Sequence, residues 1–126
     1  MTPAVRDILL ADDNPDFAET LAELLEEDGF RVRVARDGKE AVEMYRASPA
    51  DLLLFDVAMP RKDGLRAFEE IRTMSPAVPV IFLTAYASEA LRLHVVGSGE
   101  GDDLSVMMKP VEYPDLANRL AAMGSG

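Results

Sequence analysis

The segment LLLFD at residues 52–56 places four apolar side chains directly before a carboxylate. A short, continuous apolar run of this kind is typical of a strand that is buried on both faces of a parallel sheet. Similar runs occur at residues 8–10, 78–83 and about 104–108, and amphipathic stretches lie between them. Because strands that alternate with helices form right-handed crossovers, the sequence predicts a parallel sheet covered by helices on both faces.

A further strand and the helices follow from the spacing of apolar residues. Val32 and Val34 alternate with arginines, which suits a strand near the edge of the sheet. The first helix is expected to begin at Asn14 or Pro15 and to end at Gly29, since glycine readily closes a helix in the left-handed conformation. Inward-facing positions at helical spacing predict three more helices: Ala41, Val42 and Tyr45; Leu65, Phe68 and Ile71; Leu116, Leu120 and Met123. We therefore expect an α/β fold with a five-stranded parallel sheet.

Length and composition restrict the class of protein. The chain has 126 residues and is 48% hydrophobic, so we expect one globular domain at residues 1–123 and a flexible tail at 124–126. No apolar run approaches the roughly 20 residues that cross a bilayer, and the N-terminus lacks the pattern of a signal peptide. These features predict a cytoplasmic protein without a membrane partner. The formal net charge of −10 argues against direct nucleic-acid binding, because phosphate groups would be repelled.

Polar residues follow four of the predicted strands: Asp12 and Asp13, then Asp56, Thr84 and Lys109. Ligands of open α/β sheets bind beyond the carboxyl ends of the strands, so these side chains are expected to converge. Three carboxylates within ~4 Å would repel by ~4 kcal/mol per pair at an effective dielectric constant of about 20. One lysine does not balance three aspartates, so a hard divalent cation, Mg²⁺ (or Mn²⁺), is expected among them. Any one aspartate alone would be explained equally well as a turn or cap residue.

Four segments together resemble the response-regulator receiver domain of two-component signalling. They are LLADDN at residues 9–14, FDVAMPRKDG at 55–64, Thr84 with Ala85, and Lys109 with Pro110. Each motif is weak alone, but the four at these separations are specific and span nearly the whole chain. The resemblance implies a doubly wound, flavodoxin-like sheet.

The resemblance also implies roles for the site residues. Asp56 would be the phospho-acceptor, and Asp12 and Asp13 would hold Mg²⁺ directly or through water. Asp56 and the backbone carbonyl of Ala58 would be further metal ligands. The expected chemistry is an in-line attack by Asp56 on a phosphoryl group from a histidine kinase or a histidine phosphotransfer protein.

Two further residues would act on the phosphoryl group. Lys109 would neutralise its oxygens, and the Thr84 hydroxyl would hydrogen-bond one of them and move inward as a switch. The resemblance also implies a cis peptide bond between Lys109 and Pro110.

The second half of the chain departs from the family pattern. Val106 occupies the fifth-strand position where receivers often carry an aromatic switch residue, and we hypothesise that Tyr86 takes over part of that role. A weak helix is expected at about 88–95, followed by a glycine-rich segment at 97–103. The face formed by the fourth helix and the fifth strand is the expected surface for a downstream protein partner or a homodimer.

The resemblance favours a phosphorylation-switched interaction module that catalyses only its own phosphorylation and dephosphorylation. An aspartate-nucleophile hydrolase would usually need a second acid where Ala58 stands. A nucleotide or flavin binder would need a glycine-rich phosphate cradle after the first strand. A receiver that no longer accepts phosphate remains open, as do the cognate kinase, the output partner, and whether the chain is complete or part of a larger protein.

Overall fold

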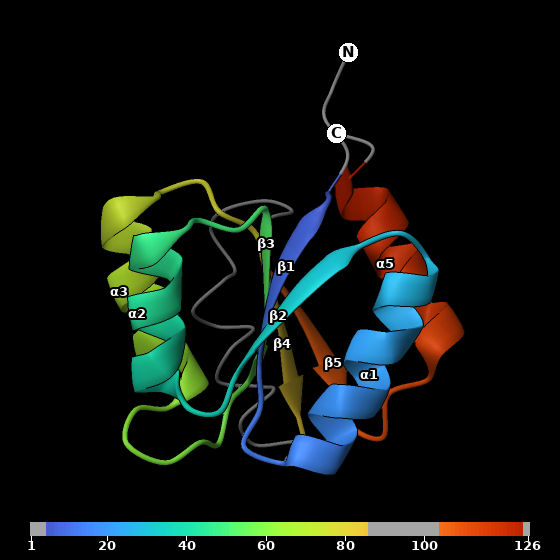
Figure 1. The fold of residues 1–126 in the computed structure, drawn as a ribbon, viewed down its shortest axis with the longest axis horizontal. Helices are drawn as coiled ribbons and strands as arrows, with labels where there is room; N and C mark the ends of the chain where they lie inside the picture. Colours follow the sequence, from blue (N-terminus) through green and yellow to red (C-terminus); the bar gives the residue numbers. More distant parts are fainter. Residues whose placement is uncertain (1–4, 86–103, 125–126) are drawn as a thin grey trace.

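The structure is a computed structural model that describes residues 5–85 and 104–124 (Figure 1). The predicted helix at 88–95, the glycine-rich segment at 97–103 and Tyr86 lie outside these residues. Within the described ranges, no helix has the length and apolar character needed to cross a bilayer.

Five parallel strands form one sheet in the order β2-β1-β3-β4-β5, which confirms the predicted sheet. β2 lies at one edge, as the arginines alternating with Val32 and Val34 predict. β3, which consists of the segment LLLFD, lies in the centre and is buried along its whole length. The strands are β1 (Asp7–Ala11), β2 (Arg31–Ala35), β3 (Leu52–Asp56), β4 (Val80–Thr84) and β5 (Leu104–Met108).

Helices cover both faces of the sheet, with α2 and α3 on one side and α1 and α5 on the other (Figure 1). The described helices are α1 (Pro15–Glu27), α2 (Gly38–Ala47), α3 (Gly64–Met74) and α5 (Tyr113–Gly124). α5 runs to Gly124, one residue past the domain boundary expected from the sequence, and residues 125–126 lie outside the described range.

Alternate side chains of β3 enter two separate hydrophobic clusters. Leu53 and Phe55 pack with α2 and α3, whereas Leu52 and Leu54 pack with α1 and α5. Each of these four side chains is fully buried, and burial of one such side chain contributes about 1.5–3 kcal/mol. A strand flanked by helices on both faces has no polar side to present to water, which explains its continuous apolar run.

Local signals set the ends of α1. The Asn14 side chain accepts hydrogen bonds from the backbone N–H groups of Asp16 and Phe17, so Asn14 is the N-cap and Pro15 the first helical residue. Gly29 follows the helix with φ +95°, the left-handed conformation expected of it.

The predicted start of β4 was wrong by two residues. Val78 is buried but lies in a turn, where its N–H donates to the carbonyl of Ser75. Pairing with β3 begins only at Val80, which stands opposite Leu53. Pro79 has no N–H to donate to the sheet. Only its carbonyl takes part, accepting the N–H of Leu53 at 3.0 Å.

Candidate functional site

Three carboxylates meet at the carboxyl end of the sheet. β1 and β3 are adjacent, and Ala11 stands opposite Phe55. Asp12, directly after β1, therefore comes beside Asp56, the last residue of β3. Asp13 joins them, and one oxygen from each of the three carboxylates lies within 4.8 Å of the others. Asp12 and Asp56 are buried, whereas Asp13 is exposed and leaves the cluster open to solvent on one side. An open cluster of oxygen ligands suits a hard divalent cation that keeps several waters.

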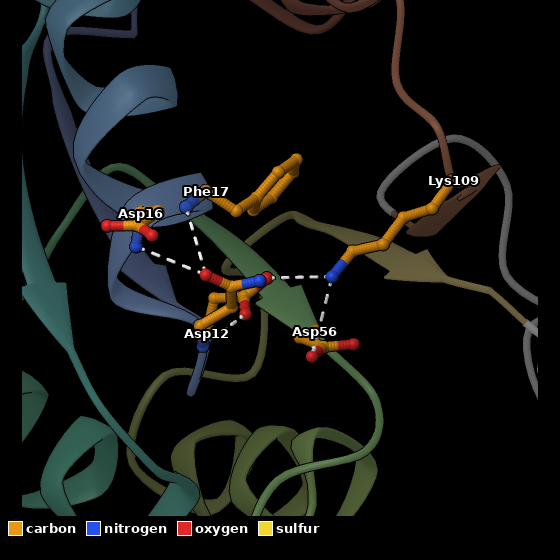
Figure 2. A network of polar contacts seen from close by, with 6 residues as sticks. Asp12, Asp16, Phe17, Asp56 and Lys109 are labelled. Atoms are coloured by element: carbon orange, nitrogen blue, oxygen red, sulfur yellow. Dashed lines mark hydrogen bonds and ion pairs between the residues drawn. The ribbon is translucent and has the colours of Figure 1, made fainter.

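Lys109 reaches into this cluster from the end of β5 (Figure 2). Its Nζ lies 2.9 Å from Asp12 Oδ2 and 3.6 Å from Asp56 Oδ2. The other Asp12 oxygen, Oδ1, accepts a hydrogen bond from the backbone N–H of Asn14 at 2.9 Å. Asp12 is therefore held from two directions, and Lys109 balances only part of the negative charge.

The Phe17 ring forms another contact of Lys109, one that sequence reasoning missed. Lys109 Nζ lies 4.5 Å from the centre of the ring, in cation–π range. At helical spacing Phe17 falls on the same face of α1 as the buried Leu21 and Leu25, and it packs against the hydrophobic cluster formed with α1 and α5. The position of Phe17 in the first turn of α1, shortly after Asp12 and Asp13, could have indicated that its ring lies near the carboxylate cluster.

The Asp56 carboxyl is unusually reluctant to ionise. Burial, then the neighbouring charges of Asp12 and Asp13, raise its pKa, while Lys109 and the backbone N–H of Ala58 lower it. Together these effects place the pKa at about 6, against an ordinary value of 3.8. The carboxyl is still mostly ionised at neutral pH. The raised pKa reflects crowding of negative charge that a bound cation would relieve.

Thr84 and Lys109 lie beside each other at the ends of neighbouring strands. Thr84 is buried and stands opposite Met108 in the β4–β5 register. The backbone N–H of Lys109 donates to the Thr84 carbonyl at 2.8 Å, which extends the pairing by one residue. The peptide bond between Lys109 and Pro110 is cis, as predicted.

The loop between β3 and α3 begins at Val57 and carries Ala58, the expected backbone ligand, which is exposed. Its end is held by the N–H of Gly64, which donates to the Val57 carbonyl at 2.8 Å. A Cβ on Gly64 would lie 2.1 Å from the carbonyl oxygen of Asp56, so only glycine permits this approach. The sequence contains Gly64 as the last residue of the segment FDVAMPRKDG but does not reveal this contact.

Val106 lies on β5, opposite Phe82 of β4. It is half-buried and packs against the cluster formed with α2 and α3. Its proposed substitute Tyr86 is not among the described residues, so the alternative switch stays a hypothesis.

The chain belongs to the family of response regulator receiver domains, whose sequence profile it matches over residues 8–121. Receiver domains of this family take part in two-component signal transduction, and a phospho-accepting role fits the family.

Known relatives include larger regulators. The chain is 36% identical over 110 residues to the transcriptional regulatory protein ZraR of Klebsiella oxytoca, covering 87% of this chain and 24% of ZraR. It is 40% identical over 116 residues to the transcriptional regulatory protein CpxR of Escherichia coli K12, covering 92% of this chain and 48% of CpxR. The chain thus spans about a quarter and about half of these two relatives.

The fold is also similar to that of a solved, metal-bound receiver. The response regulator TrrA of Thermotoga maritima, crystallised in complex with Mg(2+)-BeF, superposes with a TM-score of 0.82 at 28% identity. The match covers 94% of this chain and 98% of that one.

Proposed function

We propose that Asp56 accepts a phosphoryl group in a Mg²⁺-dependent reaction and that this chain thereby switches partner binding. The observation that carries the proposal is the meeting of Asp12, Asp13 and Asp56 within 4.8 Å, with Lys109 beside two of them. The four residues come from the ends of three strands, so this fold gathers them in one place.

The residues of the cluster fit a Mg²⁺ ion. All three offer carboxylate oxygens, the ligand type that Mg²⁺ prefers, and the exposed Asp13 leaves room for water ligands. Asp12, Asp13 and Asp56 would hold the ion together with the Ala58 carbonyl. When bound, the ion neutralises negative charge on the phosphoryl oxygens.

Asp56 is the nucleophile in this proposal. Its ionised carboxylate attacks the phosphorus in line, the bond from phosphorus to the donor breaks, and an acyl phosphate forms on Asp56. The donor is the phosphohistidine of a histidine kinase or phosphotransfer protein, and its imidazole leaves with the bonding electron pair. The ammonium of Lys109 already lies beside Asp56. It needs only a small movement away from Asp12 to contact and stabilise the new phosphoryl oxygens.

Thr84 couples the phosphoryl group on Asp56 to the rest of the domain. Its hydroxyl donates a hydrogen bond to a phosphoryl oxygen, and its carbonyl accepts a hydrogen bond from the N–H of Lys109, directly after β5. Movement of Thr84 is thus passed to β5, the described part of the surface where we propose a protein partner or a second copy binds. Hydrolysis of the acyl phosphate by the same residues returns the domain to its resting state.

Incubation with acetyl phosphate, followed by intact mass measurement, tests the assignment. We expect a single addition of 80 Da, the mass of one phosphoryl group, in the presence of Mg²⁺ and none with EDTA or in Asp56→Asn. Asp16→Asn is the matched control, because Asp16 is an exposed carboxylate in the first turn of α1 outside the cluster. An unmodified wild-type protein, or a label that persists in Asp56→Asn, contradicts the proposal.

A further inference from the structure

The loop between β3 and α3 is fastened to the beginning of α2. Arg61 lies in this loop, and its Nε and Nη2 atoms contact Asp37 Oδ2 at 2.9 and 2.8 Å. The neighbouring residue Lys62 accepts a hydrogen bond at its carbonyl from the N–H of Gly38, at 3.0 Å. In Figure 1 this loop passes beside the end of α2 at which the helix begins.

The contact between loop and helix is close enough to couple their positions. A Cβ on Gly38 would lie 2.0 Å from the Lys62 carbonyl oxygen, so the backbone of the helix start rests directly against the loop. The hydrogen bond from the N–H of Gly64 to the Val57 carbonyl joins the two ends of the loop, one on each side of Arg61. Ala58 lies between these two attachments.

Arg61 adopts a backbone conformation that arginine disfavours. Its φ is +66°, the only positive φ of a non-glycine residue in the described ranges. Glycine or asparagine would occupy this region at lower cost. The contact of its guanidinium with Asp37 compensates for this conformation and holds it in place.

Asp37 is suited to act as the fixed partner. It is buried, and its second oxygen, Oδ1, accepts the N–H of Glu40 at 2.8 Å as the N-cap of α2. Burial acts to raise its pKa, but the N–H of Glu40 and the Arg61 guanidinium outweigh this and hold the pKa below its usual value. Asp37 is therefore a carboxylate anchored to a helix, whereas Arg61 belongs to a loop.

We propose that Arg61 is a positioning residue, which through Asp37 holds the β3–α3 loop so that the Ala58 carbonyl is presented to the metal site. This inference rests on the proposed function, because it concerns the metal that Asp12, Asp13 and Asp56 would hold. Release of the loop lowers the affinity for the metal. It leaves the positions of Asp56 and Lys109, and hence the rate of phosphorylation at saturating metal, unchanged.

The test compares Arg61→Asn, Asp37→Ser and the double variant by calorimetric titration with Mg²⁺. Asparagine tolerates a positive φ without reaching Asp37, and serine still caps α2 without the ionic contact. We expect each single variant to weaken Mg²⁺ binding about tenfold, in the range measured for residues that orient metal ligands. Because the two residues act as one unit, the double variant is expected to be no weaker than either single variant.

Acetyl phosphate labelling over a range of Mg²⁺ concentrations supplies the second readout. The Mg²⁺ concentration for half-maximal rate is expected to rise about tenfold, as the affinity falls, with the rate at saturating Mg²⁺ unchanged. Arg66→Asn, which alters an exposed arginine on the adjacent α3, is the control and is expected to leave both values unchanged.

Different results overturn different conclusions. If Asp13→Asn binds Mg²⁺ as the wild type does, the metal site itself is wrong, and the role of Arg61 is wrong with it. If Asp13→Asn weakens binding but Arg61→Asn and Asp37→Ser do not, only the positioning role is wrong. Additive losses in the double variant, or a fall in rate at saturating Mg²⁺, likewise contradict it.

Discussion

Lys109 and Asp12, 97 residues apart in the chain, form an ion pair with 2.9 Å between Nζ and Oδ2. The ammonium of this lysine neutralises part of the negative charge that a cation would also neutralise. The same ammonium lies 3.6 Å from Asp56. Under the proposed function, Lys109 would therefore have two opposing effects: competition with the metal before the reaction and stabilisation of the phosphoryl group during it.

Lys109→Met is expected to separate these effects. Removal of a positive charge beside the carboxylates tightens Mg²⁺ binding by about 1 kcal/mol, or roughly fivefold. The same change slows phosphorylation at saturating Mg²⁺ by about 10²-fold, as for loss of one group that stabilises a developing charge. Calorimetry measures the first effect and a labelling time course the second. Lys39→Met removes an exposed lysine of α2 and is expected to change neither value; weaker Mg²⁺ binding in Lys109→Met would contradict this account.

Phe17→Leu is expected to act through Lys109. The ring lies 4.5 Å from the ammonium, and leucine keeps apolar packing while it removes the π face. A partly exposed cation–π contact contributes about 0.5–1 kcal/mol, so the labelling rate is expected to fall about two- to fivefold. In a Lys109→Met background the substitution is expected to have no further effect on the rate. Phe30→Leu, at another half-buried aromatic residue of the same cluster, is the control. An equal loss in both backgrounds would mean that Phe17 contributes only packing.

The sequence predicted the parts of the fold and site that depend on periodicity and strand ends. Asp12, Asp56 and Lys109 each directly follow or end an apolar run, and parallel pairing then brings them together without further information. The Asp37–Arg61 contact was not predictable in this way, because it joins the N-cap of α2 to a loop whose path depends on tertiary packing. The positive φ of Arg61 could not be predicted either, because the pattern of apolar residues does not depend on it.

The contribution of Asp56 to stability, in the absence of added metal, is expected to fall as pH rises from about 4 to about 6. Asp56 has a pKa of about 6 in the folded state, against 3.8 for an unperturbed carboxyl. Between these values the folded state binds more protons than the unfolded state, so a rise in pH favours unfolding. Asp56→Asn removes this penalty and is expected to stabilise the metal-free protein by on the order of 2 kcal/mol at pH 7, with little effect at pH 4.

Urea unfolding at several pH values, in EDTA and in saturating Mg²⁺, measures this effect. Mg²⁺ is expected to stabilise the wild type more than Asp56→Asn, since it binds the ionised carboxylate. Asp16→Asn is again the control, as an exposed carboxylate of α1. A wild-type stability that rises between pH 4 and 6 in parallel with that of Asp56→Asn would show that Asp56 does not carry the raised pKa.

Gly64→Ala is expected to lower both stability and the labelling rate, because the new Cβ would lie 2.1 Å from the Asp56 carbonyl oxygen and displace Asp56, the proposed acceptor. Forcing an extra carbon against fixed backbone costs about 3 kcal/mol. Gly29→Ala is the matched control: its position has open space within 4 Å but a φ of +95°, so it tests backbone strain alone. We expect the control to lose about 1 kcal/mol and to label at the wild-type rate. Urea unfolding and acetyl phosphate labelling at a temperature where both variants are folded measure the two effects. Normal labelling of folded Gly64→Ala would show that the position of the Asp56 backbone does not depend on this close approach.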